Sequence, residues 1–217
     1  MTSGATTRNL LAPMLRWGYR LRVHGAHHCP RRGPLLVVAP HLGFLDATAL
    51  ATCLPRPVDV LVDAGALSAV GAQLPGRIVV DEADPAPALR RALERLRAGG
   101  AVGAWSGGGL ERAAGYLALR SSALRSSALV LPAVVFGGSG RHAGDPPAWR
   151  SEVHVVVGEP FEVTVDADPL RRSSVLQAAE WVRQRVTDHA QGAAVRTGRL
   201  DGVALTPDGA APDNGPS

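Results

Sequence analysis

Six short apolar runs, separated by turn residues, set the pattern of hydrophobic and polar positions along this chain. They are residues 35–39, 58–62, 77–80, 101–105, 129–136 and 153–157. Runs of this length that are rich in valine, leucine and alanine are typical of strands buried in a sheet. We therefore expect six strands, of which the first is enclosed by Pro34 and Pro40.

Three segments between or after these runs have the features of helices. Residues 46–54 combine small residues with leucine and stop before Pro55, and residues 87–98 place leucines at helical spacing ahead of Gly99-Gly100. Residues 174–191 open with a Ser-x-x-Gln capping box. The alternation of strand and helix predicts an α/β fold, a single layered domain with a mostly parallel central sheet flanked by helices.

The two ends of the chain differ from this middle part. Residues 1–22 form an N-terminal amphipathic segment, in which residues 8–22 mix leucine, methionine and tryptophan with four arginines. This segment fits a bilayer interface, and packing against the sheet is the equally open alternative. Residues 193–217, rich in Gly, Pro, Asp and Ala, are expected to be a disordered tail. Residues 23–192 are then the folded domain.

Composition narrows the class of protein. The 217 residues are 46% hydrophobic, enough for one sizeable core, and the net charge is +4. All 23 basic residues are arginine, and they are too dispersed to predict nucleic-acid binding, while an anionic membrane surface or a phosphorylated ligand fits. Two cysteines give no disulfide framework, which favours a reducing cytoplasm. Without a long apolar run, we expect a soluble or peripheral protein.

One cluster of metal-ligating residue types precedes the first strand. It consists of His24, His27, His28 and Cys29. No second ligand cluster follows downstream, so a structural metal is the less favoured interpretation and no metal or cofactor is expected.

The strongest chemical signal is His41, followed five positions later by Asp46. The pair falls in the turn between the strand at 35–39 and the helix at 46–54, and ligands bind at the carboxyl ends of strands in open α/β sheets. A carboxylate that orients an imidazole leaves the other ring nitrogen free to take a proton from a substrate hydroxyl. In the structural alternative, Asp46 is only a helix N-cap and His41 a packed turn residue.

Together with its neighbours, this block resembles the opening block of the glycerolipid (lysophosphatidic acid type) acyltransferases. The family pattern is Val-x-Gly-x4-Pro before a strand and His-x4-Asp after it, and Val23, Gly25 and Pro30 match the first part. Further similar blocks follow in the same order at 76–82, 105–112, 131–135 and 157–161. The resemblance covers residues 20–190. It implies that His41 is the general base and Asp46 its orienting partner.

The blocks that bind the acceptor phosphate in this family are changed here. Trp105-Ser106-Gly107-Gly108-Gly109-Leu110 stands where the family has Phe-Pro-Glu-Gly-Thr-Arg, and Glu82 replaces an arginine. By position, Trp105, Ser106 and Gly107 to Gly109 are expected to contact the substrate, and the glycine amides to hold the oxyanion. Arg77 and Arg112 are the nearby cations, with Arg120 and Arg125 as further candidates.

The resemblance implies transfer of a fatty acyl group from acyl-CoA or acyl carrier protein to a hydroxyl of a lysophospholipid or other lipid-like acceptor, at the inner membrane face. A non-catalytic paralogue that binds lipid or a partner is the alternative from another class. A serine hydrolase is the third, with Ser106 as nucleophile, Asp145 or Asp166, and His189 in the chain order of a triad. Gly137-Gly138-Ser139-Gly140 fits no phosphate loop and is expected to be a flexible loop.

Overall fold

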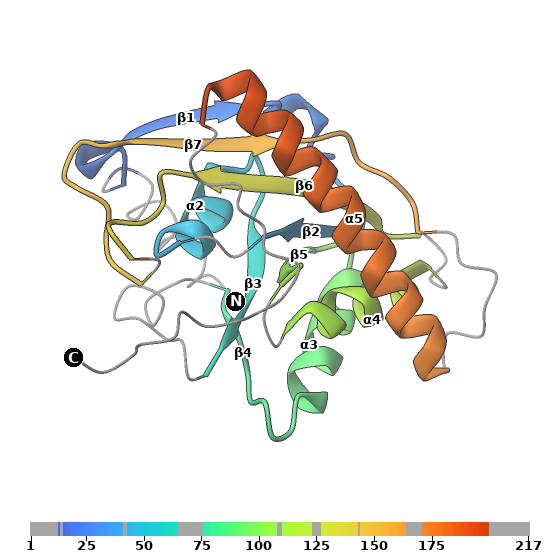
Figure 1. The fold of residues 1–217 in the computed structure, drawn as a ribbon. Coiled ribbons are helices and arrows are strands. Elements are labelled where there is room, and N and C mark those ends of the chain that lie inside the picture. The colour runs from blue at the N-terminus through green and yellow to red at the C-terminus, as the bar shows by residue number, and fades with distance from the viewer. Residues whose placement is uncertain are drawn as a thin grey trace, which may run out of the picture.

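A single seven-stranded sheet organises the computed structural model, which describes residues 13, 15–40, 43–64, 76–107, 110–122, 127–142, 144–163 and 171–199. The strands are β1 (Arg20–His24), β2 (Leu35–Ala39), β3 (Val58–Asp63), β4 (Ile78–Val80), β5 (Ala101–Trp105), β6 (Leu129–Phe136) and β7 (Glu152–Val157). Their order across the sheet is β1-β7-β6-β2-β5-β3-β4 (Figure 1). The predicted α/β class with a mostly parallel sheet is confirmed.

The strand directions divide the sheet into two groups. Strands β6, β2, β5, β3 and β4 run parallel to one another, whereas β7 runs antiparallel to β6 and β1 parallel to β7. Five strands therefore end at one edge, called here the carboxyl edge, where β1 and β7 begin. At the opposite edge, β1 and β7 end.

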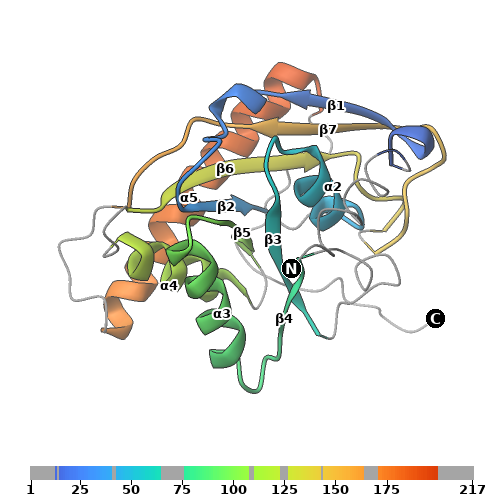
Figure 2. The ribbon, with the colours of Figure 1, turned by 180° about the vertical axis from the view of Figure 1, so that it is seen from behind.

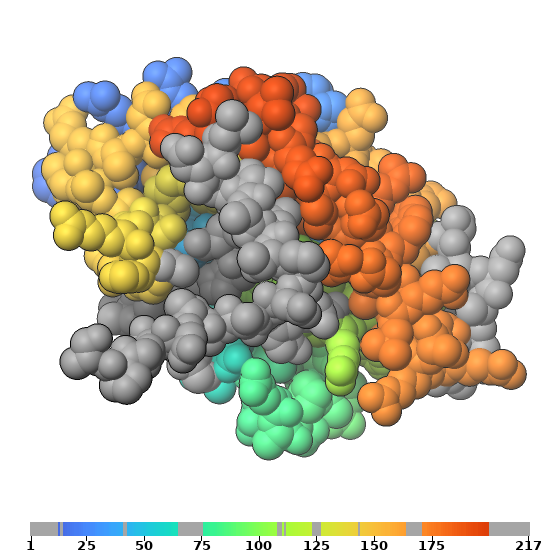
Figure 3. Space-filling view, viewed as in Figure 1, coloured from blue at the N-terminus to red at the C-terminus, as the bar shows by residue number. Residues whose placement is uncertain are grey.

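Helices cover both faces of the sheet. They are α2 (Asp46–Cys53), α3 (Ala86–Arg97), α4 (Glu111–Ser122) and α5 (Arg172–Thr197), with a short 3₁₀ helix η1 (Ala26–His28). Helix α5 crosses one face diagonally and lies along the surface in Figure 3, while α2 lies on the other face, turned to the viewer in Figure 2. This layering explains why the central strands β2 and β5 are buried on both sides.

The core is centred on β2, whose five residues are wholly buried between β6 and β5. At the edge opposite the carboxyl edge, the buried Arg56 forms hydrogen bonds to two connecting segments. Its guanidinium donates to the carbonyl oxygens of Pro30 at 3.2 Å, Gly33 at 2.8 Å and Gly99 at 2.7 Å. Three acceptors satisfy a charged group that would otherwise be costly to bury.

Helix α4 was not predicted from the sequence, because Gly115 interrupts its helical pattern. The structure gives the glycine a packing role: a Cβ atom at Gly115 would lie 2.5 Å from the Cβ of Ala179 on α5. Only a residue without a side chain allows this close crossing of α4 and α5, and the packing outweighs the low helix propensity of glycine.

Both ends of the domain also differ from the prediction. Arg20 to Arg22, assigned from sequence to the N-terminal segment, belong to the edge strand β1, which pairs with β7. Residues 193–197, assigned to the tail, form the last turn of α5, because Ala193 and Ala194 are buried against β6 and β7. Of the proposed segment and tail, residues 1–12, 14 and 200–217 lie outside the described residues.

Candidate active site

Asp46 lies at the carboxyl edge, in the turn that leads from β2 to α2. Its side chain is 0% exposed, and its Oδ2 accepts a hydrogen bond from the Gly43 N–H at 2.7 Å. Leu45 is the N-cap residue and Asp46 the first residue of the helix. The Asp46 carboxylate thus accepts a hydrogen bond from the preceding turn. Asp46 is not the helix N-cap, which the structural alternative had proposed. His41 and Leu42 lie outside the described residues.

The connection that follows β6 packs against this turn. The Leu45 N–H donates to the Gly138 carbonyl at 2.9 Å. A Cβ atom at Gly138 would lie 2.8 Å from Asp46 Oδ1, and one at Gly43 would lie 2.8 Å from Ser139 Oγ. Two glycines therefore let the backbone approach the carboxylate closely. The sequence predicted a flexible loop at residues 137–140, whereas the structure packs Gly138 and Ser139 against the turn that leads to Asp46.

The segment after β5 is attached to the end of β2. The Ser106 N–H donates to the Ala39 carbonyl at 3.0 Å, and the Ser106 side chain is buried. The Trp105 indole is only 3% exposed, and its Nε1–H donates to the Leu61 carbonyl at 2.8 Å. Gly107 follows, with no heavy atom within 4 Å of where a Cβ would stand, while Gly108 and Gly109 lie outside the described residues. The Trp105 side chain is therefore packed in the core beneath the carboxyl edge.

A cavity of about 480 Å³ opens beside the end of β4, between that strand, α3 and the start of α4. Its lining is Val80, Glu82, Pro85, Leu89, Leu110, Arg112, Ala113, Tyr116 and Val175. The walls are mostly apolar, and the two charged groups, Glu82 and Arg112, have opposite signs. The cavity therefore suits an apolar group with little net charge.

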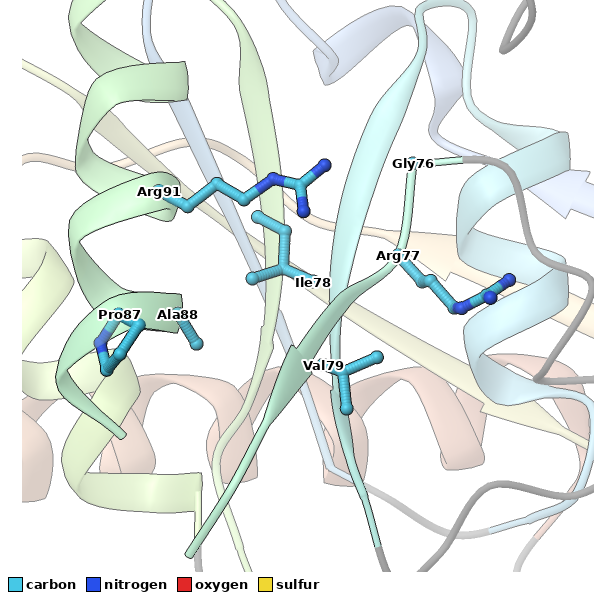
Figure 4. Close-up of a pocket in the computed structure, with 7 residues that line it drawn as sticks. All are labelled: Gly76, Arg77, Ile78, Val79, Pro87, Ala88 and Arg91. Carbon is cyan, nitrogen blue, oxygen red and sulfur yellow. The ribbon is translucent and has the colours of Figure 1, made fainter. Parts of the chain in front are cut away.

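Arg77 lies elsewhere. It precedes β4 and lines a separate cavity of about 510 Å³ together with Arg91 of α3. In Figure 4 the Arg91 side chain reaches from α3 toward Ile78, whereas the Arg77 side chain points away from α3. The structure thus does not bring Arg77 and Arg112 together. Arg120 is half-buried further along α4, and Arg125 lies outside the described residues.

The proposed hydrolase triad is not assembled. His189 lies on α5 near the end of β7, with its Nε2 3.2 Å from the Val156 carbonyl. Ser106 follows β5 at the carboxyl edge, and β7 ends at the opposite edge because it runs antiparallel to β6. Asp145 Oδ2 accepts from the His142 N–H at 3.2 Å, and Asp166 lies outside the described residues. Ser106 and His189 are therefore too far apart in the fold to act as a pair.

The cluster before β2 does not form a metal site in the described part of the chain. No group of three or more metal-ligating side chains is found there. Cys29 is buried in the core, and burial raises the pKa of its thiol, which the nearby Arg56 partly offsets. The thiol is therefore held in its neutral, weakly ligating form.

An exposed aromatic pair flanks the carboxyl edge. Trp17 is 77% exposed and Trp149 is 59% exposed, and their rings meet edge to face at 4.8 Å between centroids. They precede β1 and β7, which begin at this edge. Among the described residues, no helix is both long enough and apolar enough to cross a membrane.

Comparison with known proteins supports the fold. No family model matches the chain, and no curated protein matches it in sequence. Among solved structures, the chain is similar to the 1-acyl-sn-glycerophosphate (LPA) acyltransferase PlsC from Thermotoga maritima. The TM-score is 0.54 at 18% identity, over 87% of this chain and 83% of that one. At this identity the likeness establishes a shared α/β fold.

The close contact at Gly138 yields a stability prediction. Gly138→Ala should lower the free energy of unfolding by about 1–3 kcal/mol, because the new methyl group displaces the Asp46 carboxylate. Gly107→Ala, where the space is open, should change it by less than about 0.5 kcal/mol. Denaturant unfolding measures both. In an Asp46→Ala background the Gly138→Ala penalty should largely disappear, and an undiminished penalty would contradict the contact.

Proposed function

We propose that this chain transfers a fatty acyl group from acyl-CoA or acyl carrier protein to a hydroxyl of a lysophospholipid or other lipid-like acceptor. The observation that carries the proposal is the wholly buried Asp46, held by the Gly43 N–H in the turn that also contains His41. A carboxylate is expensive to bury unless it has partners, and a turn at the carboxyl ends of parallel strands is where ligands bind. The fold shared with a known acyltransferase agrees with this assignment.

In the proposed reaction, His41 accepts the proton of the acceptor hydroxyl while Asp46 orients the ring and stabilises the imidazolium. The hydroxyl oxygen attacks the thioester carbonyl, and amide N–H groups of Gly107 to Gly109 hold the oxyanion. When the tetrahedral intermediate collapses, the C–S bond breaks and the thiolate takes the proton from the imidazolium. The products are an ester and a free thiol, and no cofactor or metal takes part.

The cavity between β4 and α4 supports an apolar substrate. Leu89, Leu110 and Tyr116 supply apolar walls beside the end of β4. Burial of a hydrocarbon chain contributes about 0.8 kcal/mol per methylene group. We therefore assign the apolar walls of this cavity to the hydrocarbon part of the acceptor, whose headgroup then lies beside Glu82 and Arg112.

The first functional prediction concerns the base. His41→Ala should lower kcat by at least about a hundredfold, and Asp46→Asn by a comparable factor, because the two groups act as a unit. Thiol release from acyl-CoA, with lysophospholipids and non-phosphorylated alcohols as acceptors, measures the rate.

Ser106→Ala tests the serine-hydrolase alternative in the same assay, because in the proposed mechanism it removes only a substrate contact and should cost far less activity than His41→Ala. Near-normal turnover of His41→Ala would refute the mechanism. If the wild type turns over no acceptor yet still binds lipid vesicles, the non-catalytic alternative takes its place.

The second prediction concerns the acceptor headgroup. A phosphate monoester carries close to two negative charges, and arginine offsets its desolvation best. In the cavity at the strand ends, Arg112 shares the lining with Glu82, so the two charges largely cancel. We expect poor acylation of lysophosphatidic acid and glycerol 3-phosphate relative to lysophosphodiesters, glycolipids or other hydroxylated lipids.

Reversing the charge of Glu82 tests the expected preference against phosphate monoesters. Glu82→Arg should raise kcat/KM for lysophosphatidic acid about tenfold or more relative to a neutral acceptor. Glu94→Arg on α3 makes the same change of net charge outside that cavity and should leave the ratio unchanged. Efficient acylation of lysophosphatidic acid by the wild type would overturn the acceptor assignment.

The third prediction concerns the membrane. The Trp17–Trp149 pair, with the exposed Arg16 and Arg150 next to it in sequence, suits the interface of an anionic bilayer. Trp17→Ser with Trp149→Ser should weaken sedimentation with anionic vesicles about tenfold, and added salt should weaken wild-type binding. Leu176→Ser, an exposed position on α5, is the control. Equal binding by the double variant would contradict docking through this pair.

A further inference from the structure

The edge strand β1 is attached to the sheet by few contacts. In the described part of the chain its only strand partner is β7, with which it pairs over the five residues Arg20 to His24. Four of these five residues are exposed, and none is buried. Burial therefore contributes little to holding β1, and its attachment depends on the backbone ladder and on the side chains that join it to β7.

One of these side-chain contacts is a pair of histidines. His24 and His154 lie on the same face of the sheet, because His154 is the register partner of Arg22, two residues before His24. His24 Nε2 and His154 Nδ1 are 3.3 Å apart. The rings are nearly parallel, with 12° between their planes and 5.4 Å between their centroids. Since the nitrogens are much closer than the centroids, the rings are offset and meet through their nitrogens, which suits an N–H···N hydrogen bond.

His154 is the inner member of the pair, since it is 8% exposed whereas His24 is exposed. Its Nε2 is buried and has no hydrogen-bond partner among the described residues, but Glu152 Oε2 lies 3.6 Å from it. A carboxylate on that side favours the tautomer with the hydrogen on Nε2. The lone pair of the neutral ring is then on Nδ1, where His24 Nε2–H donates to it.

The charged groups around the pair belong to β1, β7 and the segments next to them. Glu152 accepts from Arg22 at 3.1 Å and from Arg199, which follows α5, at 3.4 Å. The bond from Arg22 holds the pKa of the Glu152 carboxyl below its usual range, so it stays ionised in mildly acidic solution. His24 also borders a cavity whose other ionisable lining residues are His27, His28, Glu159, Arg185, Asp188, His189 and Arg196.

The geometry of the pair tolerates one extra proton but not two. With at most one ring protonated, one nitrogen still offers a lone pair to the N–H of the other ring. With both protonated, two N–H groups and two positive charges face each other across 3.3 Å. Burial also lowers the pKa of His154; Glu152 offsets this in part, and Arg199 and His24 lower it further. Acid therefore favours an opened β1, in which both rings take up protons freely.

We propose that the His24–His154 bond is a pH-sensitive switch, which holds β1 on β7 at neutral pH and loosens it in mildly acidic solution. A histidine whose pKa is lower in the closed form stabilises that form fully above its ordinary value near 6.5, and the contribution is lost as the pH falls below it. Trp17 precedes β1 and Trp149 precedes β7, so loosening β1 also loosens their ring contact. The pair lies at the edge opposite Asp46, and its test does not depend on acyl transfer.

Hydrogen–deuterium exchange of the full chain at pH 7.5 and pH 5.5, corrected for the intrinsic exchange rate, tests the switch. On acidification of the wild type, the protection of residues 20–24 should fall about fivefold or more relative to residues 35–39 of β2, which report opening of the whole domain. One histidine with an ordinary pKa near 6.5 in the opened strand permits a change of about tenfold over this range.

Glutamine variants identify the titrating groups, because an amide donates and accepts without becoming charged. His154→Gln should reduce the pH effect on β1 to about twofold or less. His24→Gln, a change at an exposed position that the fold should tolerate, should at least halve it. His27→Gln, an exposed histidine of η1, is the matched control and should keep the wild-type effect.

Three results would overturn the proposal. They are a protection of β1 that changes no more than that of β2, a pH effect that survives unchanged in either His24→Gln or His154→Gln, and an effect that His27→Gln removes equally.

Discussion

The complete burial of β2 is the constraint on which the rest of the structure depends. A strand that is wholly enclosed needs partners on both sides and helices on both faces, because none of its backbone groups can turn to water. β6 and β5 supply the pairing, and α2 and α4 with α5 cover the faces. The same enclosure fixes where β2 ends, so that Ala39 meets the segment that follows β5 and Leu45 the segment that follows β6. The arrangement of the candidate site is thus a consequence of how the core closes.

The periodicity of the chain predicted most of the fold. Six apolar runs became strands within a residue of their expected bounds, since a strand buried on both faces has a strong and local signal. β1 and α4 escaped prediction because their stability is not local. β1 is an exposed edge strand that depends on pairing with β7, and α4 depends on a glycine whose value appears only when α5 lies against it. Tertiary packing overrode propensity in both.

For the candidate site, the sequence identified the turn and the residue Asp46, but not what surrounds it. The role of Gly138 could not be foreseen, because a contact between residues ninety-two positions apart leaves no mark on spacing. The guanidinium groups of Arg56 and Arg185 are similar cases. Arg56 binds backbone carbonyls and Arg185 lies over aromatic rings, and these partners come together only in the folded chain. A pattern within one turn can be recognised in the sequence, whereas contacts between several elements cannot.

Because β7 runs antiparallel to β6, strands end at both edges of the sheet. In a sheet with all strands parallel, every strand would offer its carboxyl end on the same side, and the other side would be built of strand beginnings. Here β1 and β7 turn their carboxyl ends the other way, so each side of the sheet receives loops with backbone amides and helix-borne side chains that can meet a ligand. If the molecule rested on a bilayer through Trp17 and Trp149, its carboxyl edge would face the lipid. The opposite edge would face the aqueous solution. One antiparallel pairing thus gives a single sheet two edges at which strands end, without a second domain.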